Sequence, residues 1–312
     1  MRCHPFIYLC LLVTIITLFN VFYITRTSKK AWRPTDARRK DVQVSLLPND
    51  EASILARIRY PNRQACVLYG QLPFQATSSR GRPAAQDMAS SRLVLGIASV
   101  ARPPGVEYLT KTLHKVIEAL DEDEVKSVQI VIAMMDKEKR TREDRAKILY
   151  RKFRAQVESG LILIVGPPTN IYPSHNFYLM RRRPFNNTVE RMEWQTKLSL
   201  DFAFLFSFAS QLGDFFMNLE DDIEPIPHFV REAFAFMDTL QSEKDQEEWS
   251  SLQFSNYLSI GRLYRCRDLS HLVDLILISY TRQPVDFIVG VLLVPYLHWQ
   301  RSRIHIFSDA SF

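Results

Sequence analysis

The stretch FFMNLEDDI (residues 215–223) decides the fold, because a short apolar run ends in three consecutive acids. Such a run predicts a buried strand, and in open α/β folds ligands bind at the carboxyl ends of these strands. Carboxylates held there suit a hard divalent cation, which in turn can bind a diphosphate. The alternative is an acidic turn before a helix that starts at Pro225 or Pro227, since acids favour helix N-termini.

On both sides of this stretch, strand patterns alternate with helix patterns. This alternation predicts an α/β fold whose parallel sheet is covered on both faces. Residues 300–312 show neither a strand pattern nor a helix stop. Strands are expected at residues 93–98, 127–135, 161–165 and 252–255, and helices at 106–120, 137–159, 189–212, 228–240 and 269–280.

The composition is that of a globular protein, with 46% hydrophobic and 24% charged residues in a chain of 312. The net charge of +6 would suit nucleic acid, but much of the basic excess lies within residues 26–40, directly behind an apolar segment. A membrane explains this cluster first, so no nucleic-acid partner is expected.

That apolar segment, residues 6–24, contains nineteen residues without a charge and follows a short tail at 1–5. It is long enough to span a bilayer and has no small-residue cleavage site after it, which indicates a transmembrane signal anchor. The basic cluster behind it favours a cytosolic domain, and thus a membrane-anchored cytosolic binding module. The only N-x-[ST] sequon, at Asn186, functions solely in the secretory lumen and favours the opposite topology.

Residues 25–91 carry scattered prolines and little periodicity, which is typical of a stem or linker, with one short helix expected within 46–58. Cys66 and Cys266 are not in metal-ligand spacing, so neither a zinc site nor a disulfide framework is indicated. They could pair in an oxidising lumen, but buried free thiols are the expectation.

The acid run has a specific chemical use. A nucleoside diphosphate leaves readily only when its developing charge is neutralised, and a cation held by carboxylates does this without a proton. In an extended segment, Glu220 and Asp222 would share one face while Asp221 points to the other. This spacing alone is a weak signal.

Eight blocks follow one another along the chain: LGIASVARP (95–103), TKTL (110–113), SGLILIVGPP (159–168), IYP (171–173), ERMEWQTKLSLDFAFL (190–205), FMNLEDDIEP (216–225), FSNYLSIGRLY (254–264) and QPVDF (283–287). With these blocks, and with the spacing between them maintained, the chain resembles the N-acetylglucosaminyltransferase IV family over about residues 92–295. The resemblance implies a GT-A-like glycosyltransferase with a Rossmann-like nucleotide-sugar-binding sheet. It also implies a single-pass type II Golgi membrane enzyme with a lumenal catalytic domain, which adds β-1,4-linked GlcNAc from UDP-GlcNAc to the α-1,3-mannose arm of N-glycans on glycoproteins.

The resemblance also implies roles for individual residues. Asp222 is the expected ligand of a divalent cation, with manganese the expected metal. Glu220 and Asp221 are expected on the ribose and diphosphate side. Independently of the resemblance, the sequon makes Asn186 the expected glycosylation site. Further nucleotide-sugar contacts are implied for Gly96, Ile97, Ser99 and Arg102 after the first strand, and for Lys197, with Trp194 and Asp201, on the long apolar helix.

The family continues into a histidine-containing segment that this sequence does not contain. The transferase domain is therefore expected at 92–299, C-terminally incomplete, followed by a divergent tail at 300–312. Asp286 is retained from the family pattern, but the general base stays unassigned. An alternative function is that of a catalytically impaired member that modulates other Golgi glycosyltransferases by association.

Overall fold

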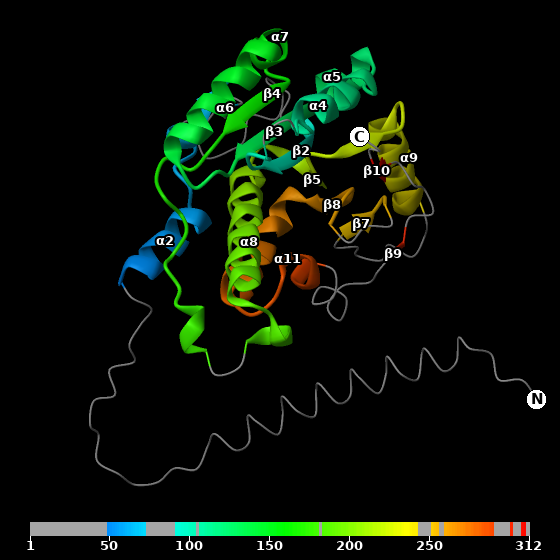
Figure 1. Ribbon diagram of the computed structural model, residues 1–312. Helices are drawn as coiled ribbons and strands as arrows, with labels where there is room; N and C mark the ends of the chain where they lie inside the picture. Colours follow the sequence, from blue (N-terminus) through cyan, green and yellow to red (C-terminus); the bar gives the residue numbers. More distant parts are fainter. Residues whose placement is uncertain are drawn as a thin grey trace, which may run out of the picture. The chain divides into compact units, whose positions relative to one another are not determined.

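Figure 1 shows the computed structural model of the 312-residue chain. The predicted tail at 1–5, the predicted anchor at 6–24 and much of the predicted stem at 25–91 lie outside the residues that the structure describes. Among the described residues, no helix combines the length and the apolar character that crossing a membrane requires. The described residues are 49–72, 91–103, 106–180, 183–242, 251–255, 259–289, 300–301 and 307–309.

Four parallel strands form the centre of the sheet, in the spatial order β4-β3-β2-β5. The chain runs outward from β2 to β4 and then returns to place β5 on the other side of β2. The strand order therefore reverses between β2 and β5, and this is where open α/β sheets bind ligands. The four strands are β2 (Ser91–Ser99), β3 (Val128–Met134), β4 (Ile162–Val165) and β5 (Gly213–Leu219).

Strands at both edges make the sheet mixed, so the prediction of a parallel sheet is correct only for its centre. On one edge β1 (Val67–Tyr69) pairs antiparallel with β4, and on the other β8 (Arg262–Arg265) pairs antiparallel with β5. Beyond β8 lie β7 (Ser251–Gln253) and β9 (Gln300–Arg301), which completes eight strands. The sequence pattern did not indicate β1 and β8, because the first is three residues long and the second carries two arginines.

Helices cover both faces of the sheet, as predicted, because neighbouring residues of each central strand point to opposite sides. On β3, Ile130 and Ile132 join the hydrophobic cluster on one face, with α4, α6, α7 and α9. Val131 and Ala133 join the cluster on the other face, with α2, α8, α10 and α11. The helices are α2 (Asn49–Arg59), α3 (Arg63–Cys66), α4 (Leu109–Glu118), α5 (Glu122–Ser127), α6 (Lys139–Lys152), α7 (Arg154–Glu158), α8 (Val189–Ala209), α9 (Phe229–Ser242), α10 (Leu269–Ser279) and α11 (Val285–Phe287), with short 3-10 turns at η1 (Phe177–Leu179), η2 (Pro184–Asn186) and η3 (Cys266–Asp268).

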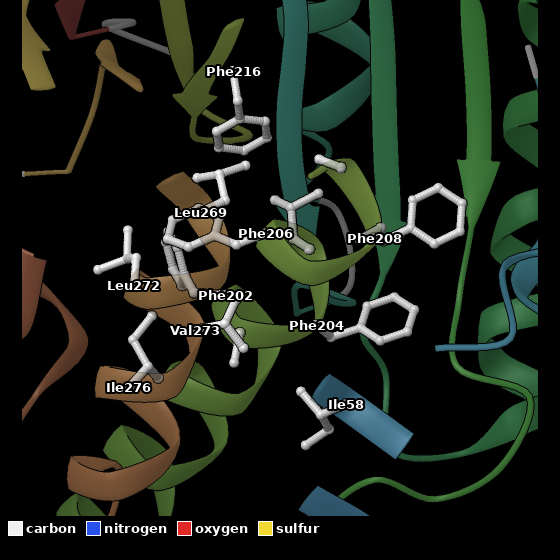
Figure 2. Close-up of a cluster of buried hydrophobic side chains, with 14 of the residues drawn as sticks. Ile58, Phe202, Phe204, Phe206, Phe208, Phe216, Leu269, Leu272, Val273 and Ile276 are labelled. Atoms are coloured by element: carbon white, nitrogen blue, oxygen red, sulfur yellow. The ribbon is translucent and has the colours of Figure 1, made fainter. Parts of the chain in front are cut away.

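The helix α8 packs across one face of the sheet. Its second half is apolar on every side, which is typical of a helix surrounded by protein. Figure 2 shows its phenylalanines in one cluster with Leu272 of α10 and Ile58 of α2. Phe206 also meets Phe216 of β5 edge-on, with ring centroids 5.2 Å apart. This packing fixes α8, so that its first half lies in a defined position near the carboxyl ends of the strands.

Gly96 is a packing residue, not a contact for uridine as the resemblance implies. It lies buried within β2, and a Cβ atom there would be 2.3 Å from Cε2 of the Phe216 ring. Ile97 is also buried inside this strand, which continues to Ser99. The residues of this segment that reach the edge of the sheet where a ligand could bind therefore begin at Ala98, which is partly exposed.

The folded unit begins earlier than the boundary predicted at residue 92. It includes the helix expected within 46–58, which is α2. Ile58 of α2 is fully buried, and the Ser207 hydroxyl of α8 donates a hydrogen bond of 2.7 Å to the Arg59 carbonyl. This part of the predicted stem is therefore built into the core.

Two further sequence predictions need correction. The tail at 300–312, expected to lack strands, supplies β9 and also β10 (Phe307–Asp309), which pairs with β6 (Ile223–Pro225). The helix expected at 137–159 is two helices, α6 and α7, because Phe153 leaves the helical conformation and buries its ring.

The two cysteines of the described region are free and buried, as predicted. Burial raises the pKa of Cys66 to about 11 and that of Cys266 to about 12. Both therefore remain protonated at neutral pH, and they are packing residues, not nucleophiles.

Candidate functional site

A cavity of about 460 Å³ opens at the carboxyl ends of β2, β3 and β5, at the reversal of strand order. It brings together most of the predicted site residues, and Ser99 lies behind Asp221 at its wall. It also contains residues for which no role was predicted. Asp136 and Lys137 follow β3, and Asp286 lies near the start of α11. The polar lining residues are Arg102, Asp136, Lys137, Lys197, Asp201, Glu220, Asp221, Asp222 and Asp286.

Asp221 points into the protein and organises the loop after β2. Its side chain is 4% exposed, and it accepts hydrogen bonds from Ser99 Oγ at 2.8 Å and from Arg102 Nη2 at 2.5 Å. The Thr112 hydroxyl donates to its backbone carbonyl at 2.9 Å. Asp221 therefore links Ser99, at the end of β2, to Arg102, which lines the cavity.

An ion pair between Arg145 and Asp136 supports the same loop from the side of β3. Arg145 donates from Nη2 to Ser99 Oγ at 2.9 Å and from Nη1 to Asp136 Oδ2 at 2.6 Å. The other oxygen of Asp136 accepts from the Ala101 amide at 2.7 Å. Sequence reasoning missed both residues. Asp136 carried a usable signal, since it follows a predicted strand at the same edge of the sheet, but Arg145 did not.

Glu220 and Asp222 are the other two acids of the run. Glu220 accepts a hydrogen bond of 3.1 Å from Ser259 Oγ, and Asp222 is half-buried with its Oδ2 4.0 Å from Arg102 Nη2. Burial raises the pKa of Glu220 to about 7, and the like charges of Asp222 and Asp286 add to this effect. The segment turns after Glu220, so the extended alternation expected for the three acids does not occur.

Lys197 is engaged in an ion pair on α8. Its ammonium donates to Asp201 Oδ2 at 2.6 Å and to the Met135 carbonyl at 2.8 Å, and the Tyr172 hydroxyl donates to Asp201 Oδ1 at 2.7 Å. Burial raises the pKa of Asp201 to about 6, so at neutral pH the carboxylate is still charged. The negative charge of Asp201 balances the positive charge of Lys197. The exposed Lys137 at the same cavity is therefore better suited to bind a phosphate.

A second cavity, of about 340 Å³, adjoins the first along the ends of β3 and β4, and both are lined by Lys137 and Lys197. Its other walls come from the loop after β4 and from α8, with polar and aromatic side chains. The two cavities together follow the carboxyl edge of the sheet from β5 to β4.

A profile described as the MGAT4 conserved region matches residues 80–309. The chain belongs to this family. Two relatives, each named as an alpha-1,3-mannosyl-glycoprotein 4-beta-N-acetylglucosaminyltransferase, illustrate the similarity. The B enzyme of Homo sapiens is 30% identical over 201 residues, covering 64% of this chain and 35% of that protein. The A enzyme of Mus musculus is 30% identical over 230 residues, covering 72% of this chain and 42% of that protein.

These MGAT4 relatives are considerably longer than the chain, which spans well under half the length of both. Among solved structures, S. aureus TarS 1–349 in complex with UDP-GlcNAc overlaps 59% of this chain and 48% of its own, at 12% identity and a TM-score of 0.33. A score this low allows no residue to be transferred. Family membership thus rests on the sequence match.

The acids of this MGAT4 member fit a divalent cation. Glu220 and Asp222 offer the carboxylate oxygens that hard cations prefer. Burial is the main cause of the raised pKa of Glu220, and the neighbouring acids add to it, so a bound cation would favour the charged form of this carboxylate. Asp221 already accepts one hydrogen bond on each oxygen, from Ser99 and from Arg102.

One other group within the described part of the chain could hold a metal by distance alone. The ligand atoms of Asp121, Glu124 and His228 lie within 4.8 Å of one another. However, Asp121 and Glu124 form the capping box of α5, and Arg231 donates to both carboxylates, from its side chain and its amide respectively. Their hydrogen bonds join the starts of α5 and α9, and none of the three lines either cavity.

Asp286 is the one acid of the cavity that comes from α11. It is half-buried near the start of this short helix, after Pro284, and it is close enough to Glu220 to raise the pKa of that residue. Sequence reasoning left the general base of this MGAT4 member unassigned. The geometry makes Asp286 the candidate, because Asp136 and Asp201 are held by Arg145 and Lys197, Asp221 is held by Arg102, and Glu220 and Asp222 fit a cation.

Proposed function

We propose that the protein is a UDP-GlcNAc-dependent, inverting N-acetylglucosaminyltransferase that forms a β-1,4 linkage on the α-1,3-mannose arm of N-glycans carried by glycoproteins. One observation carries the proposal: the cavity at the reversal of strand order joins Arg102 and Lys137 to the acids Glu220, Asp222 and Asp286. The two cationic side chains can bind the diphosphate of the donor. The acids can hold a metal ion and accept a proton from an acceptor hydroxyl. Membership of the MGAT4 family and the names of its relatives support the same reaction.

The residues of the cavity divide the work of this reaction. Glu220 and Asp222 would hold a divalent cation, with manganese proposed. When bound, such a cation neutralises the charge that develops on the departing diphosphate. Arg102, oriented by Asp221, presents its guanidinium to the same phosphates. Asp286 accepts the proton of the acceptor hydroxyl as that oxygen attacks the anomeric carbon, so it acts as the general base.

The proposal predicts different effects for two variants of the full-length protein. Asp222→Asn should weaken manganese-dependent UDP-GlcNAc binding at least about tenfold, since it removes a metal-ligand oxygen. Asp286→Asn should leave donor affinity within about twofold and lower kcat for transfer to a biantennary N-glycan by about 100-fold or more, as expected for loss of a general base. Calorimetric titration of the donor and a radiolabelled transfer assay would measure the two effects.

Asp144→Asn is the matched control, because this exposed acid on α6 lines neither cavity. It should leave both measurements unchanged. A wild-type protein that does not bind UDP-GlcNAc with manganese would refute the proposed donor. Full transfer by Asp286→Asn would refute the role of the base.

We also propose that the protein is a single-pass type II membrane protein of the Golgi, with its catalytic domain in the lumen. The apolar run at 6–24 supports an anchor, and the sequon supports the lumen, because Asn186 is exposed in the turn that precedes α8. In cells, treatment with an N-glycan-removing glycosidase should shift the wild-type protein to lower mass, whereas Asn186→Gln should show no shift. Asn187→Gln preserves the sequon and is the control. An unshifted wild-type protein that is accessible to protease from the cytosol would contradict this topology.

A further inference from the structure

One face of α8 forms a wall of the acid-bearing cavity. The residues of this face recur at spacings of three and four positions, as expected for one side of a helix. Trp194 begins this face, and its indole is 49% exposed although the side chain lines the cavity. An isolated exposed aromatic residue needs no explanation, but an exposed indole at the wall of a cavity rich in acids is a candidate contact for a ligand. The residues of this face are Trp194, Lys197, Leu198, Asp201 and Phe202.

The two faces of the Trp194 indole have different surroundings. The guanidinium of Arg191, one turn earlier, lies over the ring with its Cζ 4.3 Å from the centroid. A cation over one face is attracted by the ring quadrupole and restricts the orientation of the side chain. One face is thereby occupied, and the other remains available to a ligand in the cavity.

Different elements of the cavity suit the two substrates. The groups proposed to bind the diphosphate come from the loop after β2 and the turn after β5, where the buried Asp221 holds Arg102. Trp194 comes from α8 and is 49% exposed. An acceptor sugar of a glycoprotein approaches from the solvent and can reach the exposed Trp194 without displacing a diphosphate held by Arg102.

We propose that Trp194 is a stacking platform for a pyranose ring of the acceptor glycan. This inference rests on the proposed function, and it adds the acceptor subsite to it. A pyranose ring has an apolar face of C–H groups, which the electron-rich face of an aromatic ring attracts. The hydroxyls at the edge of the sugar are then free to meet the carboxylates of the cavity, among them Asp286.

The test measures glycan and donor separately on the full-length protein. Binding of a biantennary N-glycan in the presence of UDP and manganese is followed without turnover, because UDP carries no sugar to transfer. Binding of UDP-GlcNAc is measured without glycan. Trp194→Ala should weaken glycan binding about tenfold, as truncation of an aromatic anchor does, and leave donor affinity within about twofold. Trp194→Phe should retain most of the glycan affinity, because it keeps an aromatic face.

Tyr178→Ala is the matched control, since Tyr178 is 73% exposed and lines neither cavity, and its glycan affinity should equal that of wild type. Unchanged glycan binding in Trp194→Ala would overturn the inference. So would a loss of UDP-GlcNAc affinity in that variant, because the indole would then stack on the donor. A wild-type protein that binds the glycan but not UDP-GlcNAc would refute the proposed function, and a tenfold loss in Trp194→Ala would still support the platform.

Discussion

Asp201→Ala is expected to lower the free energy of unfolding by about 3–5 kcal/mol, the range observed when one partner of a buried ion pair is removed. Asp201 is 3% exposed and accepts from both Lys197 and Tyr172. Its loss leaves the partly buried Lys197 ammonium with the Met135 carbonyl and the face of the Tyr172 ring, and without a negative charge beside it. Urea unfolding at pH 7, followed by circular dichroism, would measure the change.

The explanation predicts a coupling between the two charges. Lys197→Met should also be strongly destabilising, because it leaves the Asp201 carboxylate uncompensated. The combination of Asp201→Leu with Lys197→Met should cost much less than the sum of the single changes, since no unpaired charge remains. Additive losses would show that the two side chains contribute independently and that the ion pair is not the cause.

Asp221→Ala is expected to reduce kcat/KM for transfer by about 100-fold, the scale of effect produced when a group at a reacting centre is misplaced by about 1 Å. The carboxylate makes no contact with a ligand in the proposed site. It holds Arg102 at the cavity and also accepts from Ser99. Stability should fall as well, by about 2–3 kcal/mol, because hydrogen bonds to a charged, buried group are lost. The transfer assay and urea unfolding would measure the two effects.

A second variant tests whether Asp221 acts through Arg102. If it does, Arg102→Ala and the double variant should lose kcat/KM to a similar extent, because the arginine is already misplaced in Asp221→Ala. Asp123→Ala removes a fully exposed acid at the start of α5 and should change neither activity nor stability appreciably. A double variant whose losses multiply would assign Asp221 a separate role.

The central fold was predictable because its signals are local. The runs that became β2, β3, β4 and β5 are apolar almost throughout, as buried parallel strands are, and the segments between them carry apolar residues at helical spacing. The strands β1 and β8 were not predictable in this way. Their places in the sheet depend on pairing with strands about 100 and 50 residues away in the sequence.

The candidate site was predictable in part for the same reason. The acid run and Arg102 follow apolar strands, and parallel strands end at one edge, so the sequence alone indicates that these residues meet. It does not indicate which acid turns inward. Asp221 does so because Ser99, at the end of β2, and Arg102, on the loop that follows, bind its carboxylate. That choice depends on the position of β5 beside β2 in the sheet.

The early helix α2 limits where the protein can be shortened. The family match begins at residue 80, and a soluble version that starts there would lack α2 and β1. Removing α2 would remove Ile58, which packs in the same hydrophobic cluster as the apolar half of α8. The phenylalanines of α8 would then be exposed to solvent. Because the same helix carries Trp194, Lys197 and Asp201, such a truncation would loosen the wall of the cavity. Secreted forms made for assays should therefore begin before Asn49.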